Sequence, residues 1–226
     1  MIAARDAARV LGVAEATYLR STREAYDRLA AVYAERFRTE LAGRPLDRAL
    51  LAAFAEFVRA AGAGPVADLG CGPGNATAHL HSLGLTAFGV DLSPEMVRLA
   101  RQAHPDLRFE EGSMTALDLP DGTLGGILSR YSIIHIPPDR LPDVFAEFHR
   151  VLASGGYVML AFQAGEGPAA FDHKVSLAYR WPSDGLAALL SHAGLPVFAQ
   201  LLREPDDTER FQQAYLLARK TAATSP

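Results

Sequence analysis

The sequence predicts an α/β fold in which helices cover both faces of a mostly parallel sheet, and three observations carry this prediction. Between about residues 65 and 162, short apolar runs alternate with longer stretches of helical period. Two helical stretches precede the first of these runs. Near the end of the chain, two more apolar runs are separated only by a charged turn, so we expect an antiparallel pair that brings the sheet to seven strands.

Two amphipathic helices come first. From about residue 15 to residue 38, Tyr26, Ala30, Tyr33 and Phe37 recur on one helical face. The second helix spans residues 46–61 and ends at Gly62, the residue type that helices often use as a stop signal. We therefore expect residues 1–64 to form a helical cap on a domain over residues 65–226.

The alternating region predicts strands near 65–69, 86–91, 107–111, 124–130 and 156–162, with helices near 75–83, 94–103 and 139–152. Residues 163–182 contain Gly165, Gly167 and Pro168 and have no clean period, so we expect a loop or lid with at most a short helix. Ser183 is expected to cap a helix that runs to about residue 192. The closing strands are expected over 197–202 and 211–218.

Composition narrows the class of protein. A chain of 226 residues with 49% hydrophobic content suffices for one sizeable core, and its formal charge of -4 argues against a nucleic acid or an anionic membrane as partner. Cys71 is the only cysteine, residues 1–13 lack the apolar run of a signal peptide, and no residues have metal-ligand spacing. We expect a cytoplasmic protein without a metal that acts on a small molecule; the oligomeric state is not indicated.

A glycine-rich loop, VADLGCGPGN at residues 66–75, follows the first predicted strand and opens a helix. Glycines let the backbone pass close to a ligand, and the free amides at a helix start can face it. A dinucleotide-binding loop would place a third glycine three residues after the second. Asn75 or Thr77 stands there instead, which disfavours a nicotinamide cofactor.

This loop resembles the first motif of class I S-adenosylmethionine-dependent methyltransferases. The resemblance implies a Rossmann-like three-layer sandwich and methyl transfer that leaves S-adenosylhomocysteine. It also implies that Asp68 is linked to the methionine part of the cofactor and that the loop passes beneath it, at Gly70, Cys71, Gly72 and Gly74.

Asp91 ends the second predicted strand, where its carboxylate could accept hydrogen bonds from both ribose hydroxyls. The alternative is that Asp91 caps the next helix, but Ser93 is better placed for that. In the similar family the aspartate binds ribose. The other cofactor-binding residues expected by resemblance are Leu92, Met96, Gly112, Ser113, Met114 and Ser129.

Methyl transfer is a displacement that depends mainly on positioning, so no motif has to announce a catalytic residue. His135, shortly after the fourth strand, could act as a base, or it could simply fix its loop. Arg130, next to Tyr131, could meet a substrate carboxylate or pair on the surface. Tyr26 and Tyr33 could close over the cofactor or be ordinary core residues.

The segment 163–182 is expected to select the acceptor, with His173, Tyr179 and Trp181 as candidate substrate-binding residues. The hypothesis favoured by the sequence is methyl transfer to an oxygen or nitrogen of a small metabolite. Because cofactor motifs report binding and not transfer, a cyclase, an isomerase or a regulator that retains the cofactor is the alternative.

Overall fold

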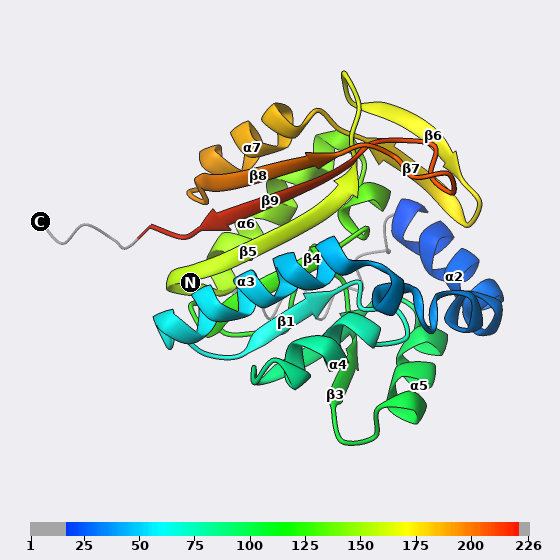
Figure 1. Cartoon of the computed structure of the whole chain (residues 1–226), viewed down its shortest axis with the longest axis horizontal. Coiled ribbons are helices and arrows are strands. Elements are labelled where there is room, and N and C mark those ends of the chain that lie inside the picture. The colour runs from blue at the N-terminus through cyan, green and yellow to red at the C-terminus, as the bar shows by residue number, and fades with distance from the viewer. Residues whose placement is uncertain (1–16, 222–226) are drawn as a thin grey trace, which may run out of the picture.

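The structure is a computed structural model that describes residues 17–221 (Figure 1). Its central sheet has seven strands in the order β3-β2-β1-β4-β5-β9-β8. Strands β1 to β5 are mutually parallel, and β9 pairs antiparallel with both β5 and β8. The strands are β1 (Val66–Leu69), β2 (Ala87–Asp91), β3 (Arg108–Glu111), β4 (Leu124–Arg130), β5 (Leu152–Gln163), β8 (Val197–Arg203) and β9 (Gln213–Arg219). The predicted α/β class and closing antiparallel pair are confirmed.

Helices form the outer layers of the sandwich. The helices are α2 (Thr17–Phe37), α3 (Pro45–Ala61), α4 (Asn75–Ser82), α5 (Pro94–Ala103), α6 (Leu141–Val151) and α7 (Ser183–His192), with short 3-10 turns η1 (Glu40–Gly43), η2 (Ile133–His135) and η3 (Pro138–Arg140). Side chains of α6 and α7, such as Phe145 and Leu186, are buried against one face of the sheet. Leu51 and Phe54 of α3 and Leu80 of α4 are buried against the other.

Local signals in the sequence set several helix ends. Gly62 closes α3 in the left-handed conformation, with φ 59°. Ser93 caps α5, because its hydroxyl accepts a hydrogen bond from the Met96 amide at 3.1 Å. The α6 helix ends at Val151, so Leu152, which we expected to be the last residue of this helix, instead begins β5.

The segment 163–182 is not a loop with a short helix, as we had predicted from its lack of period. It contains an antiparallel hairpin of β6 (Ala169–His173) and β7 (Ser176–Arg180), separate from the main sheet. Lys174 turns the chain with a positive φ of 26°. The expected Ser183 cap is also wrong, because Pro182 is the N-cap and Ser183 is already helical. Half-buried and exposed residues alternate along β6, as expected for a strand, but this alternation is visible only in the folded hairpin.

The first described helix, α2, lies across the carboxyl ends of the strands and next to the β6–β7 hairpin (Figure 1). Asp27 accepts a 2.5 Å hydrogen bond from the Ser93 hydroxyl at the start of α5. The Phe37 carbonyl accepts a 2.9 Å hydrogen bond from the side-chain amide of Asn75 at the start of α4. The expected cap therefore consists of α2 over the end of the sheet, whereas α3 is a layer of the sandwich itself; residues 1–16 lie outside the described part.

None of the helices in the described residues is both long enough and apolar enough to cross a membrane.

Candidate functional site

A pocket opens where the parallel strands end, between the sheet and α2. It encloses about 780 Å³, part of it open to solvent. Open parallel sheets place ligands at this edge. The lining residues come from α2 and from the segments that follow β1, β2, β3 and β4; they are Tyr18, Leu19, Thr22, Arg23, Tyr26, Tyr33, Leu69, Gly70, Gly72, Val90, Asp91, Leu92, Ser93, Gly112, Ser113, Met114, Arg130, Tyr131, Ser132, His135 and Ile136.

Asp91 is held rigidly in this wall. One carboxylate oxygen accepts a 2.7 Å hydrogen bond from the Gly72 amide, and the other accepts a 2.9 Å bond from the Ser93 amide. Burial raises the pKa of Asp91, and these two amide donors oppose the rise. Each oxygen of a carboxylate has a second lone pair, so both can still accept a hydrogen bond from a ligand.

Two glycines of the loop meet different constraints. Gly70 has φ +75°, and a Cβ there would stand 2.3 Å from the Ser132 Cβ, so no side chain fits. Gly72 has φ +53°, yet a Cβ there would meet no protein atom within 4 Å. The first glycine lets the loop pack on the segment after β4, and the second keeps the pocket wall bare.

Five of the expected cofactor-binding residues do not line the pocket: Asp68, Cys71, Gly74, Met96 and Ser129. Asp68 is buried and accepts a 2.7 Å hydrogen bond from the Thr77 hydroxyl, and burial raises its pKa to about 6. Met96 of α5 is fully buried, and burial raises the pKa of the Cys71 thiol. The Ser129 hydroxyl lies 2.6 Å from that of Ser132, which itself donates to the Leu69 carbonyl. These contacts support the loop from within the protein.

His135 joins three parts of the chain. Its Nδ1 lies 2.8 Å from the Leu177 carbonyl oxygen of β7, and its Nε2 lies 2.8 Å from the Tyr26 hydroxyl of α2. A carbonyl oxygen can only accept, so Nδ1 carries the proton and Nε2 accepts one from Tyr26. Burial, with a smaller contribution from the nearby His173, lowers the pKa of His135 to about 4.

Tyr26 and Tyr33 both line the pocket, with ring centroids 5.6 Å apart in an edge-to-face arrangement. Burial raises the pKa of Tyr26 well above its usual value and that of Tyr33 to about 12. Both are therefore protonated donors at neutral pH. The core and ligand interpretations of these rings are not exclusive, because each ring packs on its neighbours and faces the pocket.

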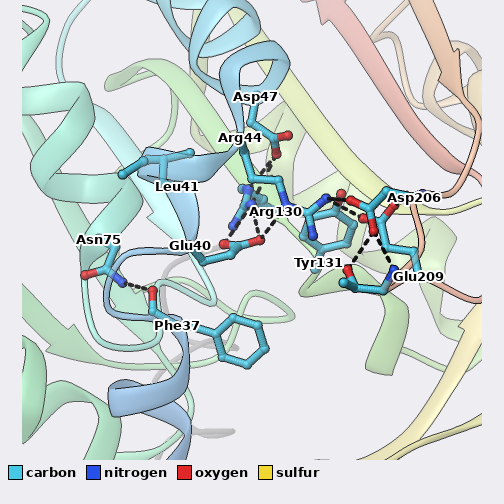
Figure 2. Close-up of polar contacts among 12 residues, drawn as sticks. Phe37, Glu40, Leu41, Arg44, Asp47, Asn75, Arg130, Tyr131, Asp206 and Glu209 are labelled. Carbon is cyan, nitrogen blue, oxygen red and sulfur yellow. Dashed lines mark hydrogen bonds and ion pairs between the residues drawn. The ribbon is translucent and has the colours of Figure 1, made fainter.

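Arg130 lies in a buried ionic cluster rather than in a surface pair (Figure 2). Its guanidinium bonds to Glu40 of η1 at 3.0 Å and to Asp47 of α3 at 3.1 Å. Asp47 also accepts a 3.1 Å hydrogen bond from the Tyr215 hydroxyl of β9. The cation that we considered for a substrate carboxylate is thus already shared by two carboxylates.

The cluster continues outward through Arg44, which bonds to Asp206 at 2.7 Å and to Glu209 at 2.8 Å in the turn between β8 and β9 (Figure 2). The segment between α2 and α3 is therefore tied both to the end of β4 and to the far hairpin of the sheet.

Tyr131 also lines the pocket, with a positive φ of 55° that is rare for a residue with a side chain. Its hydroxyl lies 3.3 Å from that of Tyr215. Backbone strain of this kind gathers at functional sites, where the surrounding structure enforces it.

The three expected substrate residues of the hairpin segment do not line the pocket. The His173 ring lies edge-to-face on His135, with centroids 5.1 Å apart. Tyr179 packs against the core, and Trp181 is only 4% exposed and belongs to the core itself. The structure corrects Trp181 most clearly, because a side chain so enclosed has no surface to offer an acceptor.

Sequence analysis missed the first turns of α2, where Tyr18, Leu19, Thr22 and Arg23 face the pocket, and it missed Ser132 and Ile136 beside His135. A signal did exist, because Tyr18 and Thr22 extend the face of Tyr26 by whole helical turns. Among residues 17–221, no group of three or more His, Cys, Asp or Glu side chains is placed to hold a metal ion.

Comparison with known proteins gives a consistent result. Residues 66–156 match the family model of a methyltransferase domain. The trans-aconitate 2-methyltransferase of Escherichia coli is 34% identical over 146 residues, which are 62% of this chain and 54% of that protein. The chain spans about half the length of the curated relatives it matches.

Two solved structures share the fold. The 1,6-didemethyltoxoflavin-N1-methyltransferase of Burkholderia thailandensis, solved with 1,6-didemethyltoxoflavin and S-adenosylhomocysteine, is 24% identical with a TM-score of 0.62, over 87% of this chain and 90% of that one. A Haloferax volcanii methyltransferase in complex with an activator protein is 21% identical with a TM-score of 0.66, over 91% and 100%. Sequence similarity identifies a methyltransferase domain over residues 66–156, and together with the shared fold it supports the class I S-adenosylmethionine-dependent methyltransferase superfamily.

Proposed function

We propose that this protein transfers the methyl group of S-adenosylmethionine to an oxygen or nitrogen atom of a small molecule. The observation that carries the proposal is Asp91, whose two carboxylate oxygens are oriented by the Gly72 and Ser93 amides at the pocket wall. In that position the carboxylate can receive both hydroxyls of a ribose.

The residues present fit the cofactor. The bare wall at Gly72 leaves room for a ligand beside the backbone, where a Cβ would meet no protein atom within 4 Å. Leu92 and Met114 offer apolar contacts for an adenine ring, and Ser113 offers a hydroxyl to its edge. At both positions where a dinucleotide loop would need its third glycine, the side chain has a structural partner, since Asn75 bonds to Phe37 and Thr77 to Asp68.

When bound, the cofactor supplies an electrophilic methyl group on a sulfonium sulfur. The chain then has to hold the acceptor in line with that methyl and to exclude water, which is where much of the acceleration of a displacement can come from. Tyr26, Tyr33, Tyr131 and Ile136 supply the aromatic and aliphatic surface for this.

A small-molecule acceptor is supported by the enclosed shape of the pocket and by the net charge of -4, which does not favour an anionic polymer. The proposal includes a cytoplasmic setting and chemistry without a metal. We propose that residues 163–182, which include the hairpin of β6 and β7, form the substrate lid; Thr22 of α2 contacts Ser176 of this segment at 3.3 Å.

Calorimetry with S-adenosylhomocysteine and with S-adenosylmethionine tests the cofactor site. We expect saturable heat from both, and in Asp91→Ala a Kd weaker by at least about 100-fold, because two hydrogen bonds to a charged group are lost. Asp106→Ala, an exposed turn residue, is the control and should bind as the wild type does.

A panel of small hydroxyl, amine, thiol and carboxylate compounds, with release of S-adenosylhomocysteine as the readout, tests transfer. Absence of heat with both compounds would remove the proposed site altogether. Binding with no turnover across the panel, combined with retention of intact cofactor during another conversion, would instead favour a cyclase or isomerase.

A further inference from the structure

An unbroken chain of hydrogen bonds runs through the acceptor side of the pocket. It begins at the Leu177 carbonyl of β7, passes through both ring nitrogens of His135 in η2 and ends at the Tyr26 hydroxyl of α2, with 2.8 Å at each link. The three residues lie 42 and 109 positions apart in sequence. Such an arrangement requires α2 and the hairpin to be docked at the same time.

The Leu177 carbonyl, at one end of this series of hydrogen bonds, determines where the protons lie. Because the Leu177 carbonyl can only accept, Nδ1 of His135 is the protonated nitrogen. The lone pair of Nε2 therefore faces the Tyr26 hydroxyl, which donates to it. With its hydrogen directed at His135, the Tyr26 oxygen keeps lone pairs that can accept a proton from another molecule in the pocket.

We propose that Tyr26 and His135 form a proton relay for a hydroxyl acceptor, in which Tyr26 contacts the acceptor and His135 receives the proton behind it. This inference rests on the proposed function and deepens it by naming the acceptor class.

The chemistry of acceptors explains why a relay indicates a hydroxyl. A carboxylate has no proton to lose, and a neutral amine can attack first and release its proton later. A hydroxyl is a weak nucleophile unless its proton leaves as it attacks, which is the task of a general base. Arg130, which could have bound a carboxylate acceptor, is neutralised by Glu40 and Asp47.

The acceptor oxygen forms a bond to the methyl carbon while the carbon–sulfur bond breaks, and that electron pair stays on sulfur. The acceptor proton passes to the Tyr26 oxygen as the Tyr26 proton passes to Nε2 of His135. One positive charge leaves the sulfur and one appears on the imidazole, so the net charge of the pocket does not change.

The electrostatics of His135 set its charge before the exchange. Burial lowers its pKa to about 4, so the ring is neutral at pH 7 and does not repel a sulfonium. The Leu177 carbonyl, which opposes that lowering, would stabilise the imidazolium once it forms. The hairpin thus acts as a positioning element, since it fixes the tautomer that leaves Nε2 available.

A purely structural role is the competing interpretation; NMR tests, without any acceptor, the tautomer and the hydrogen bond that the relay requires, and kinetics then separate the two roles. In protein labelled with 15N at histidine, His135→Gln assigns the signals of His135 among those of seven histidines. We expect one protonated and one bare nitrogen from pH 6 to 9, with the bare one, Nε2, shifted in Tyr26→Phe. Tyr33→Phe is the control, because Tyr33 contacts the Tyr26 ring and not His135.

Kinetics with the acceptors found by the panel supply the second readout. Tyr26→Phe and His135→Gln should each lower kcat about 100-fold, with S-adenosylhomocysteine binding within about 3-fold of wild type. The double variant should lose no more than the worse single variant, because the two groups act as one unit. The active acceptors should be hydroxyl compounds.

Several results would overturn the relay: a proton on Nε2 of His135, a charged ring at pH 7, a Tyr26→Phe spectrum equal to that of wild type, or acceptors that are carboxylates. Failure of S-adenosylhomocysteine to bind the wild type would instead remove the proposed function. The two failures are thus distinguishable, since the NMR measurement does not depend on the cofactor.

Discussion

The two sides of the pocket are built in different ways. The sheet side consists of loop backbone with its glycines, the Asp91 carboxylate and side chains such as Leu92 and Met114, which come from the ends of neighbouring parallel strands and the loops after them. The opposite side, which we term the cover, consists of α2 and η2, which line the pocket, and of the β6–β7 hairpin docked behind them; side chains such as Tyr26 and His135 join the three parts.

The difference has a physical origin. Parallel strands bring their ends together wherever the sheet forms, so the sheet side is assembled by the fold itself. The cover has no such framework and depends on particular contacts among distant segments. A substitution on the sheet side should therefore affect cofactor binding, whereas one in the cover should affect how segments dock and how the acceptor reacts.

The largest loss of stability is expected from Arg130→Met, which weakens the attachment of the cover. It leaves Asp47 and Glu40 without their shared cation, and Asp47 is only 3% exposed. Loss of one partner from a buried ion pair typically costs about 3 to 5 kcal/mol. Urea unfolding should show a loss of this order.

The matched control is Arg38→Ala, which breaks the Glu35 pair, where both side chains are about 70% exposed. Its effect should stay below about 0.5 kcal/mol. Equal losses in the two variants would show that the cluster around Arg130 does not behave as a buried one.

The sheet side is broken by Gly70→Ala, whose Cβ would stand 2.3 Å from the Ser132 Cβ at a φ of +75°. The left-handed conformation and the clash together should cost about 3 kcal/mol in unfolding free energy.

Gly72→Ala is the companion variant. Residue 72 also has a positive φ, but a new Cβ there would meet open space instead of a protein atom. It should cost only about 1 kcal/mol in unfolding free energy and still weaken S-adenosylhomocysteine binding, since the methyl enters the ligand wall. Unchanged binding in this variant would contradict the placement of the cofactor beside the loop.

Asp68→Asn should stabilise the protein. Burial raises the pKa of Asp68 to about 6, so the folded state binds more protons than the unfolded state between pH 3.8 and about 6, and wild-type stability falls as pH rises through that window. Removing the charge should raise Tm by about 3 °C at pH 8 and less at pH 5. A larger gain at pH 5 would contradict the shift. The exposed Asp106→Asn should show no such trend.

The smallest expected effect is on the pH dependence of stability, through the protonation of His135 in the cover. The unfolded chain protonates this residue near pH 6.5, but the folded protein does so only near pH 4, because the ring is buried beside Tyr26 and His173. Between those pH values the unfolded state binds more protons, so stability should fall as the pH drops. The difference in Tm between wild type and His135→Gln should narrow over the same window, and a constant difference would contradict the shift.

Much of the sheet side could be predicted from sequence because its signals are local. The loop from Asp68 to Gly74, the aspartate at the end of β2 and the cap at Ser93 are each read from a few neighbouring residues. Sequence could not tell which of them face the ligand space, since Asp68 and Met96 lie next to lining residues yet point into the protein interior.

The hairpin at 163–182 shows what local patterns miss. Its strands are short and pair only with each other, and in β7 Leu177 is exposed while its polar neighbour Ser176 is half-buried, so burial does not follow an apolar–polar alternation that sequence analysis can detect.

The sequence by itself determined the sandwich, the glycine loop and the carboxylate that follows it, because periodicity and turn chemistry act between near neighbours. Only the tertiary structure decided that Tyr26 donates a hydrogen bond to His135, that Arg130 forms ion pairs with Glu40 and Asp47, and that Trp181 belongs to the hydrophobic core. Each of those outcomes depends on which distant segments meet at the end of the sheet, and that is settled by packing across the whole chain.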